Sequence, residues 1–185
     1  TFYYTRRFGQ NEDFFVSHRV ASKWTDAKPV DQLNTSRSEG AMALAPSGDW
    51  MVFTWCNVPS GYGRCDLYIS FLHDSTWSEP LNLGSEVNTS EWESGPTLGR
   101  GGKTLYYVSS KSGGKGESDI YRANWEEGKR WTNRVNLGDS INSAGKELSP
   151  FLHPDGRTLY FRSNGWPGIG GFDLFVSRKK EDGSW

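Results

Sequence analysis

The segment Asp119-Ile120-Tyr121-Arg122-Ala123 shows the pattern that decides the fold, an aspartate followed by one apolar and one aromatic residue. The pattern starts again, at spacings of 53 or 54 residues, at Asp13, Asp66 and Asp173. Tryptophan keeps the same period at Trp24, Trp77, Trp131 and Trp185. Glutamate keeps it at Glu39, Glu93 and Glu147. Three independent series with one period indicate a tandem repeat of about 54 residues.

Each complete repeat contains four short strand signals separated by turn signals. In the third repeat, strands are expected up to Leu98 and over 104–108, 119–123 and 134–137, with a last turn at 126–128. Apolar and aromatic residues favour the strands, and clusters of Gly, Asp and Ser favour the turns. We therefore predict an all-β chain of four-stranded antiparallel units, which at this length are typical of the blades of a β-propeller.

The repeat boundaries divide residues 1–185 into a partial blade (1–38), two complete blades (39–92 and 93–146) and a second partial blade (147–185). The two partial blades overlap instead of completing each other, so the chain is expected to form an arc of about three and a half blades. We favour a piece of a larger propeller, in which the parent chain supplies the missing blades. The alternative is a second copy that pairs through exposed edge strands.

Three segments of the last repeat carry a resemblance to a known family: Glu147-Leu148-Ser149-Pro150, residues 155–161 (Asp-Gly-Arg-Thr-Leu-Tyr-Phe) and residues 170–175 (Gly-Gly-Phe-Asp-Leu-Phe). They resemble the WD40-like repeats of TolB-type propellers and of OmpA-linked envelope proteins of Bacteroidota, which include a type IX secretion component. The resemblance covers nearly the whole chain and implies the propeller fold. For function it is suggestive, since fold does not fix function. It implies a bacterial envelope protein that is periplasmic, associated with the outer membrane, or extracellular.

Composition excludes several classes of partner. The chain has 21 basic and 22 acidic residues and a net charge of -1, which gives no electrostatic basis for binding nucleic acid. No stretch approaches the roughly 18 apolar residues of a membrane span, so direct membrane insertion is not expected. Aromatic residues make up 15% of the chain, a fraction that favours a folded β protein over a disordered one.

The repeated residues are interpreted as structural, because an active site is needed once and not in every blade. Each tryptophan is expected to cover the outer edge of its own blade or a neighbouring blade, whereas stacking on carbohydrate would need exposed rings. Each aspartate is expected to accept hydrogen bonds from backbone amides of the preceding loop. Each glutamate is expected to tie a linker to the next blade, or alternatively to line the central channel.

Function is expected where the repeats differ. The hairpins 57–64, 111–117 and 164–171 and the linkers 84–92 and 138–146 are long, and in a propeller they open on one face. Long loops on a rigid scaffold commonly carry recognition. The candidate binding residues on this face are aromatic or basic and do not repeat: Tyr62, Arg64, Trp92, Lys111, Lys115 and Trp166.

The two cysteines, Cys56 and Cys65, flank one hairpin and can meet the geometry of a disulfide. A disulfide favours an oxidising compartment such as the periplasm or the cell exterior. Two buried thiols are the alternative reading.

Catalytic and metal-binding patterns are poor. His18, His73 and His153 fall at non-equivalent repeat positions without metal-ligand spacing, and we predict no cofactor, no metal and no enzymatic activity. The leading hypothesis is a protein–protein interaction scaffold of the bacterial envelope that binds a partner through the long-loop face, in a secretion or peptidoglycan-associated assembly. The alternatives are a glycan-binding or glycan-cleaving propeller, with Glu39, Glu93 and Glu147 as the candidate acids, and the accessory propeller of a serine peptidase.

Overall fold

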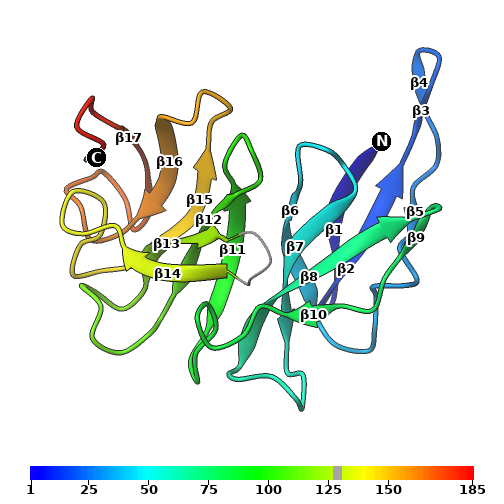
Figure 1. Cartoon of the computed structure of the whole chain (residues 1–185), viewed down its shortest axis with the longest axis horizontal. Helices are drawn as coiled ribbons and strands as arrows, with labels where there is room; N and C mark the ends of the chain where they lie inside the picture. The colour runs from blue at the N-terminus through cyan, green and yellow to red at the C-terminus, as the bar shows by residue number, and fades with distance from the viewer. Residues whose placement is uncertain (127–130) are drawn as a thin grey trace.

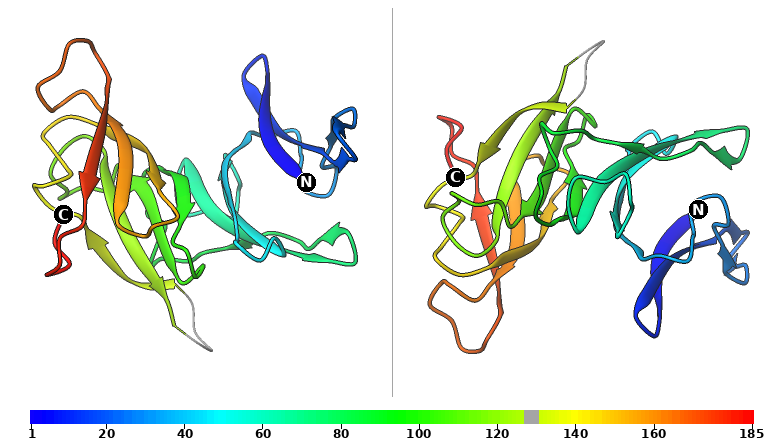
Figure 2. Two further views of the ribbon diagram at one scale, coloured as in Figure 1. Left: turned by 90° about the horizontal axis from the view of Figure 1, so that it is seen from above. Right: turned by 90° about the horizontal axis from the view of Figure 1, so that it is seen from below.

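The computed structural model describes residues 1–126 and 131–185, and the regular elements in these residues are all β-strands. Antiparallel sheets follow one another along an arc, as Figures 1 and 2 show. This arrangement confirms the predicted all-β architecture of four-stranded antiparallel blades. No helix that could cross a membrane occurs in the described part of the chain. The turn expected at 126–128 falls largely on residues 127–130, which lie outside the described residues.

The sheets define four blades, numbered here in chain order. Blade 1 consists of β1 (Phe2–Phe8), β2 (Asn11–Ser17) and β5 (Lys28–Pro29), with a small outlying hairpin of β3 (Arg19–Val20) and β4 (Lys23–Trp24). Blade 2 consists of β6 (Glu39–Leu44), β7 (Trp50–Cys56), β8 (Cys65–His73), β9 (Thr76–Trp77) and β10 (Leu81–Asn82). Blade 3 consists of β11 (Glu93–Leu98), β12 (Thr104–Ser109), β13 (Asp119–Trp125) and β14 (Trp131–Asn136). Blade 4 consists of β15 (Glu147–Leu152), β16 (Thr158–Ser163) and β17 (Asp173–Arg178).

Apolar residues cover both faces of an inner blade, because successive side chains of a strand point to opposite faces. In β12, Leu105 and Tyr107 belong to a core cluster shared with blade 2, whereas Tyr106 and Val108 belong to a cluster shared with blade 4. A third cluster joins blades 1 and 2 around Phe14. The hydrophobic core is therefore divided into three layers, one between each pair of neighbouring blades.

The repeated tryptophans contribute to these layers. Trp77 is 5% exposed, and its ring centroid lies 5.7 Å from that of Tyr3 in the preceding blade. Trp131 is 1% exposed and packs with Trp50 and Val52 of blade 2. Burying an indole removes about 150–250 Å² from water, worth about 4–6 kcal/mol before entropy is counted. The inner tryptophans thus fasten each blade to the one before it.

The tryptophans of the first and last blades are covered to different extents. Trp24 is 54% exposed, because no blade lies in front of blade 1 in this structure. Trp185 follows β17 without entering a strand, and it packs edge-on against Tyr106 of blade 3 with a centroid distance of 6.1 Å. The expected covering role therefore depends on whether a preceding blade is present.

Candidate functional site

Aspartates hold the tips of the long hairpins in place. Asp66 accepts hydrogen bonds from the backbone N–H groups of Tyr62 (2.6 Å) and Gly63 (3.0 Å). The same backbone contacts recur in blades 3 and 4, at Asp119 and Asp173. Asp13 differs because the turn before it contains only residues 9–10, so blade 1 has no long hairpin for this side chain to hold. Each of the three long hairpins is thus held at its tip by one aspartate.

Buried glutamates fix the linkers of the same face. Glu93 is fully buried and accepts hydrogen bonds from the N–H (2.8 Å) and hydroxyl (2.7 Å) of Thr89 and from the hydroxyl of Ser109 (2.6 Å). Fully buried carboxylates accept the corresponding linker bonds at Glu39 and Glu147. Burial raises the pKa of Glu39 and that of Glu93 above their ordinary values. These hydrogen bonds correspond to the expected role of each glutamate, which is to tie a linker to the next blade. They also leave the three carboxylates away from solvent.

The hairpin of blade 2 lies against the linker that follows the blade. The N–H of Arg64 donates to the carbonyl of Glu91 (2.8 Å), and a parallel β-bridge joins Cys65 to Trp92. Gly63 fits here because a Cβ at this position would lie 2.3 Å from the Glu91 carbonyl oxygen. The loops of this face therefore support one another through backbone contacts.

Four of the predicted binding residues lie at or near hairpin tips. Tyr62 is 51% exposed, and Arg64 beside it is exposed as well. Lys115 is exposed and forms an ion pair with Asp139 of the next linker (2.6 Å). Lys111 is half-buried, and its ammonium group donates to the Ser112 carbonyl (3.0 Å). Tyr62 and Arg64 are thus brought together on one hairpin.

The two tryptophans predicted to bind on this face are half-buried. Trp92 and Trp166 both pack against the core layer between blades 3 and 4. The indole N–H of Trp166 also donates to the carbonyl of Ile141 (2.9 Å). Each indole therefore has part of its surface committed to the fold, which leaves Tyr62 and Arg64 as the more available contacts.

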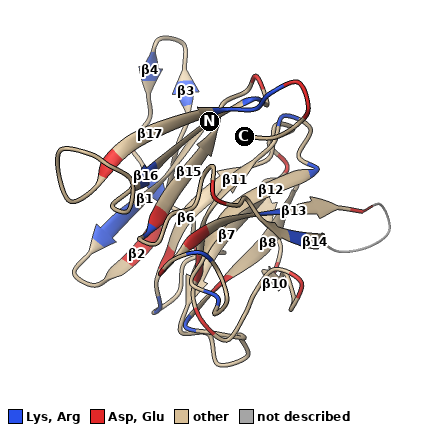
Figure 3. Cartoon of the chain, turned by 90° about the vertical axis from the view of Figure 1, so that its left-hand side faces the viewer, with Lys and Arg blue, Asp and Glu red and all other residues tan. Residues whose placement is uncertain are grey.

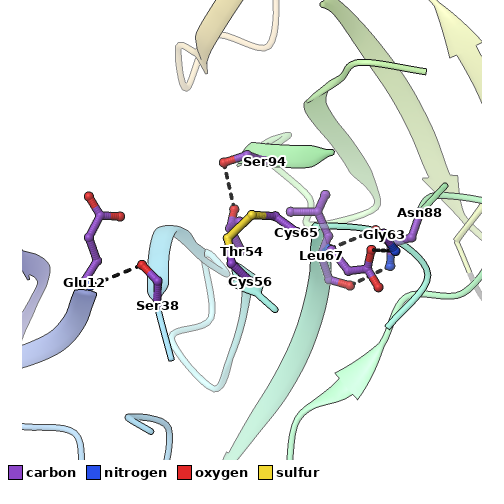
Figure 4. The surroundings of a disulfide bond; sticks show 10 residues. Glu12, Ser38, Thr54, Cys56, Gly63, Cys65, Leu67, Asn88 and Ser94 are labelled. Atoms are coloured by element: carbon purple, nitrogen blue, oxygen red, sulfur yellow. Dashed lines mark hydrogen bonds between the residues drawn. A yellow bond between two sulfur atoms is a disulfide. The ribbon is translucent and has the colours of Figure 1, made fainter. Parts of the chain in front are cut away.

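A disulfide closes the hairpin that carries Tyr62. Cys56 and Cys65 are register partners of β7 and β8, and their sulfur atoms are bonded at 2.01 Å (Figure 4). The structure contains no free cysteine in its described residues. The bond fixes the base of the hairpin, while Asp66 fixes its tip.

Two hollows lie away from the long loops. The inner strands of blades 2, 3 and 4 border a groove of about 540 Å³, lined mainly by apolar residues such as Leu44, Pro96 and Phe151. Between blades 2 and 3 an aromatic cavity of about 310 Å³ is lined by Trp50, Phe71, Trp125 and Trp131, together with the turn 101–103. Neither lining includes an aspartate or glutamate among the described residues, and these residues contain no group of three potential metal ligands.

Charges of both signs are interspersed over the side shown in Figure 3, in agreement with the near-neutral composition. The three histidines are exposed and lie apart, on blade 1, blade 2 and the first turn of blade 4. His153 pairs with Asp155 (3.2 Å), whose carboxylate accepts backbone N–H groups of the turn, and these bonds hold the pKa of Asp155 well below its usual range. This cluster stabilises a turn and resembles no catalytic arrangement.

Comparison with known proteins identifies the architecture. No family model and no curated protein matches the chain. Among solved structures, TolB from Acinetobacter baumannii superposes with a TM-score of 0.63 at 14% identity, over 94% of this chain and 37% of that one. A putative TolB from Agrobacterium tumefaciens gives 0.61 at 16% identity, over 97% and 57% of the two chains. The fold of this chain is that of β-propeller blades, as in these two structures.

The same propeller architecture also carries enzymes. An α-L-arabinofuranosidase from Lactobacillus brevis superposes with a TM-score of 0.56 at 13% identity, over 97% of this chain and 68% of that one. At such identities the likeness shows the fold alone. This propeller arc spans 37% and 57% of the two TolB chains, so it corresponds to part of their length.

The aromatic cavity between blades 2 and 3 was not predicted from the sequence. Its lining residues Trp50 and Phe71 are register partners, and the equivalent pair in blade 1 is Thr1 and His18, whose side chains are hydrogen-bonded (3.1 Å). A comparison of each repeat position across blades would have marked the extra aromatics as departures from the pattern. Their gathering at one cavity follows only from the packing of blade 3 on blade 2.

Proposed function

We propose that this propeller arc is a non-catalytic protein-binding module of a bacterial cell envelope, which contacts its partner through the long-loop face. The observation that carries the proposal is the hairpin 57–64, where a disulfide and the Asp66 carboxylate fix the backbone while Tyr62 and Arg64 stay exposed. Tyr and Arg are enriched among residues that dominate binding energy. A pre-ordered loop loses little entropy on binding.

The disulfide supports an envelope location, since disulfides persist in oxidising compartments. The resemblance to OmpA-linked repeats supports an assembly concerned with secretion or with peptidoglycan. Catalysis receives no support from the geometry, because the three repeated glutamates are each occupied by linker hydrogen bonds.

The test is a quantitative pull-down from a Bacteroidota envelope extract with the intact chain and two variants. The double variant Tyr62→Ala/Arg64→Ala removes the exposed tip, and Arg157→Ala changes an exposed arginine of the opposite face as the matched control. We expect a partner that is retained by the intact chain and by Arg157→Ala and is depleted at least tenfold with the double variant. Equal retention by all three proteins would refute the long-loop face as the binding surface.

One observation favours glycan binding as a second candidate. The cavity between blades 2 and 3 presents Trp50, Phe71 and Trp125, and an aromatic pocket with few polar groups is typical of small-ligand sites. Titration of oligosaccharides against tryptophan fluorescence tests this candidate. Trp125→Ala should abolish the signal, whereas Leu72→Ala, its register equivalent in blade 2, should retain it.

A further inference from the structure

The cavity between blades 2 and 3 is bordered by three aromatic residues that depart from the repeat: Trp50, Phe71 and Trp125. The other blades carry a threonine at the first of these positions: Thr1, Thr104 and Thr158. At the second position they carry a polar or charged residue: His18, Asn124 and Arg178. At the third they carry Arg19, Leu72 and Lys179. Departures at three repeat positions, contributed by two blades, therefore meet at one cavity.

The three rings leave an open space between them. Trp131 forms the buried wall, and its ring centroid lies 6.4 Å from that of Trp50 and 5.6 Å from that of Trp125. Trp125 itself is 37% exposed, so the cavity of about 310 Å³ opens to solvent. This volume lies at the lower end of the range for small-ligand sites, about 300–1,000 Å³. An aromatic surface of this kind remains available to a short ligand.

A glycine lets the short turn of blade 3 reach this cavity. Gly102 has a φ of +68°, and a Cβ at this position would lie 3.0 Å from the Trp50 ring. At the equivalent Gly48 and Gly156, nothing lies within 4 Å of such a Cβ. The close approach therefore belongs to one pair of blades, and it brings Lys103 to the lining of the cavity.

Lys103 supplies the charge of the lining. It is exposed, and its ammonium group has no ion-pair or hydrogen-bond partner in the described part of the chain. Since the described lining contains no aspartate or glutamate, a cationic ligand would be repelled without compensation. A neutral ligand would leave the ammonium group unpaired. The lining thus fits a ligand that combines a ring with an anionic group.

We propose that this cavity binds a glycan segment containing a uronic acid, with the sugar ring on the aromatic wall and the carboxylate paired with Lys103. The inference rests on the glycan-binding candidate for the same cavity and specifies the charge of its ligand. The C–H groups of a pyranose face pack on the electron-rich faces of aromatic rings, while the hydroxyl groups stay in water. A uronate carboxylate is ionised at neutral pH and forms a charge-assisted hydrogen bond with an ammonium group.

The site lies away from the hairpin proposed to bind a protein partner. Trp50 begins β7 and Cys56 ends it, so the cavity and the disulfide-closed hairpin lie at opposite ends of this strand. A glycan in the cavity therefore leaves the long-loop face accessible.

The probe is a short oligomer of galacturonic acid, compared with the same oligomer whose carboxyl groups are methyl esters. Titration calorimetry with the intact chain measures both affinities. We expect the acid to bind about fivefold more tightly than the ester, the size typical of a partly exposed ion pair. The affinity of the acid should fall as salt rises and that of the ester should not, because salt screens exposed charges.

Variants at one repeat position separate this ion pair from the general charge of the protein. Lys103→Met removes the ammonium group from the cavity, and Arg157→Met changes the equivalent exposed residue of blade 4 as the control. Lys103→Met should bind the acid and the ester alike, whereas Arg157→Met should keep the preference for the acid.

A third variant tests the aromatic wall. Trp125→Leu introduces the residue that blade 2 carries at this position, and it should weaken the binding of both oligomers about fivefold. All three substituted positions are exposed, so the variants should fold, which circular dichroism and thermal melting check.

Two negative results have different meanings. Equal affinity of the intact chain for the acid and the ester, or a preference that survives in Lys103→Met, would overturn the uronic acid as ligand and leave the glycan-binding candidate standing. Absence of binding for both oligomers would overturn the inference together with that candidate.

Discussion

Asn88 holds the backbone of Leu67 at both of its polar groups. Its Oδ1 accepts from the Leu67 N–H (2.8 Å), and its Nδ2 donates to the Leu67 carbonyl (3.0 Å). Asn88 belongs to the linker after blade 2 and Leu67 to β8, so this side chain ties the linker to the strand, beside the backbone bond from the Leu83 N–H to the Leu67 carbonyl (3.0 Å). The same pairing joins Asn34 to Phe14 and Asn142 to Ile120.

Replacing Asn88 by Ala should destabilise the fold by about 1–3 kcal/mol, because the buried Leu67 N–H loses its partner and the Leu67 carbonyl keeps only the Leu83 N–H. Urea unfolding followed by tryptophan fluorescence measures the change. Ser85→Ala serves as the control, since Ser85 is an exposed residue of the same linker. A loss below about 0.5 kcal/mol for Asn88→Ala would show that the linker holds without this contact.

Glu93 should make stability depend on pH in a direction opposite to that of an ordinary paired carboxylate. Burial raises its folded-state pKa above the unfolded value of 4.5, so the folded state binds more protons than the unfolded state between these two values. The stabilisation from this group is therefore complete below pH 4.5 and is lost as the pH rises through the raised pKa.

The measurement is the free energy of unfolding against pH for the intact chain and for Glu93→Gln, which cannot titrate. The intact chain should lose stability relative to the variant as the pH rises from 4.5. Parallel curves for the two proteins would contradict the expected protonation.

Reducing the disulfide should cost about 2.5 kcal/mol, the loop-closure entropy expected for a loop of this length. The comparison is between the intact chain in oxidised and reduced form and Cys56→Ser/Cys65→Ser, whose stability should not respond to reductant. Thiol titration of the unfolded, unreduced protein should find no free thiol. Two reactive thiols would show that the bond does not form.

Truncation of Trp77 and of Trp24, which occupy the same repeat position, should reduce the free energy of unfolding by very different amounts. Trp77→Ala should cost about 3–5 kcal/mol, because it empties a buried site against Tyr3. Trp24→Ala should cost less than about 1 kcal/mol of stability, because its ring is already more than half exposed. Thermal or urea unfolding of both variants gives the comparison, and equal losses would mean that the two rings are buried alike.

Much of the fold could be predicted because each blade uses the same local contacts. The spacing of Asp66, Asp119 and Asp173 marked the strand after each long hairpin, and the structure places their carboxylates on the hairpin amides. The sequence predicts less of the binding face. Trp92 and Trp166 stand out in the sequence as non-repeating aromatics, but their partial burial depends on the neighbouring blade. The cavity of Trp50, Phe71 and Trp125 joins residues that are distant in sequence.

The sequence by itself determined the period, the strand content of each blade, and the carboxylates that brace its loops, because these depend on contacts within one repeat or between a repeat and its linker. Only the tertiary structure decided which members of a repeated series are buried. Trp24 and Trp77 occupy the same repeat position, yet one is exposed and the other is covered. The physical reason is that hydrophobic burial at this position needs the face of the preceding blade, which blade 2 has in blade 1 and blade 1 lacks in this structure.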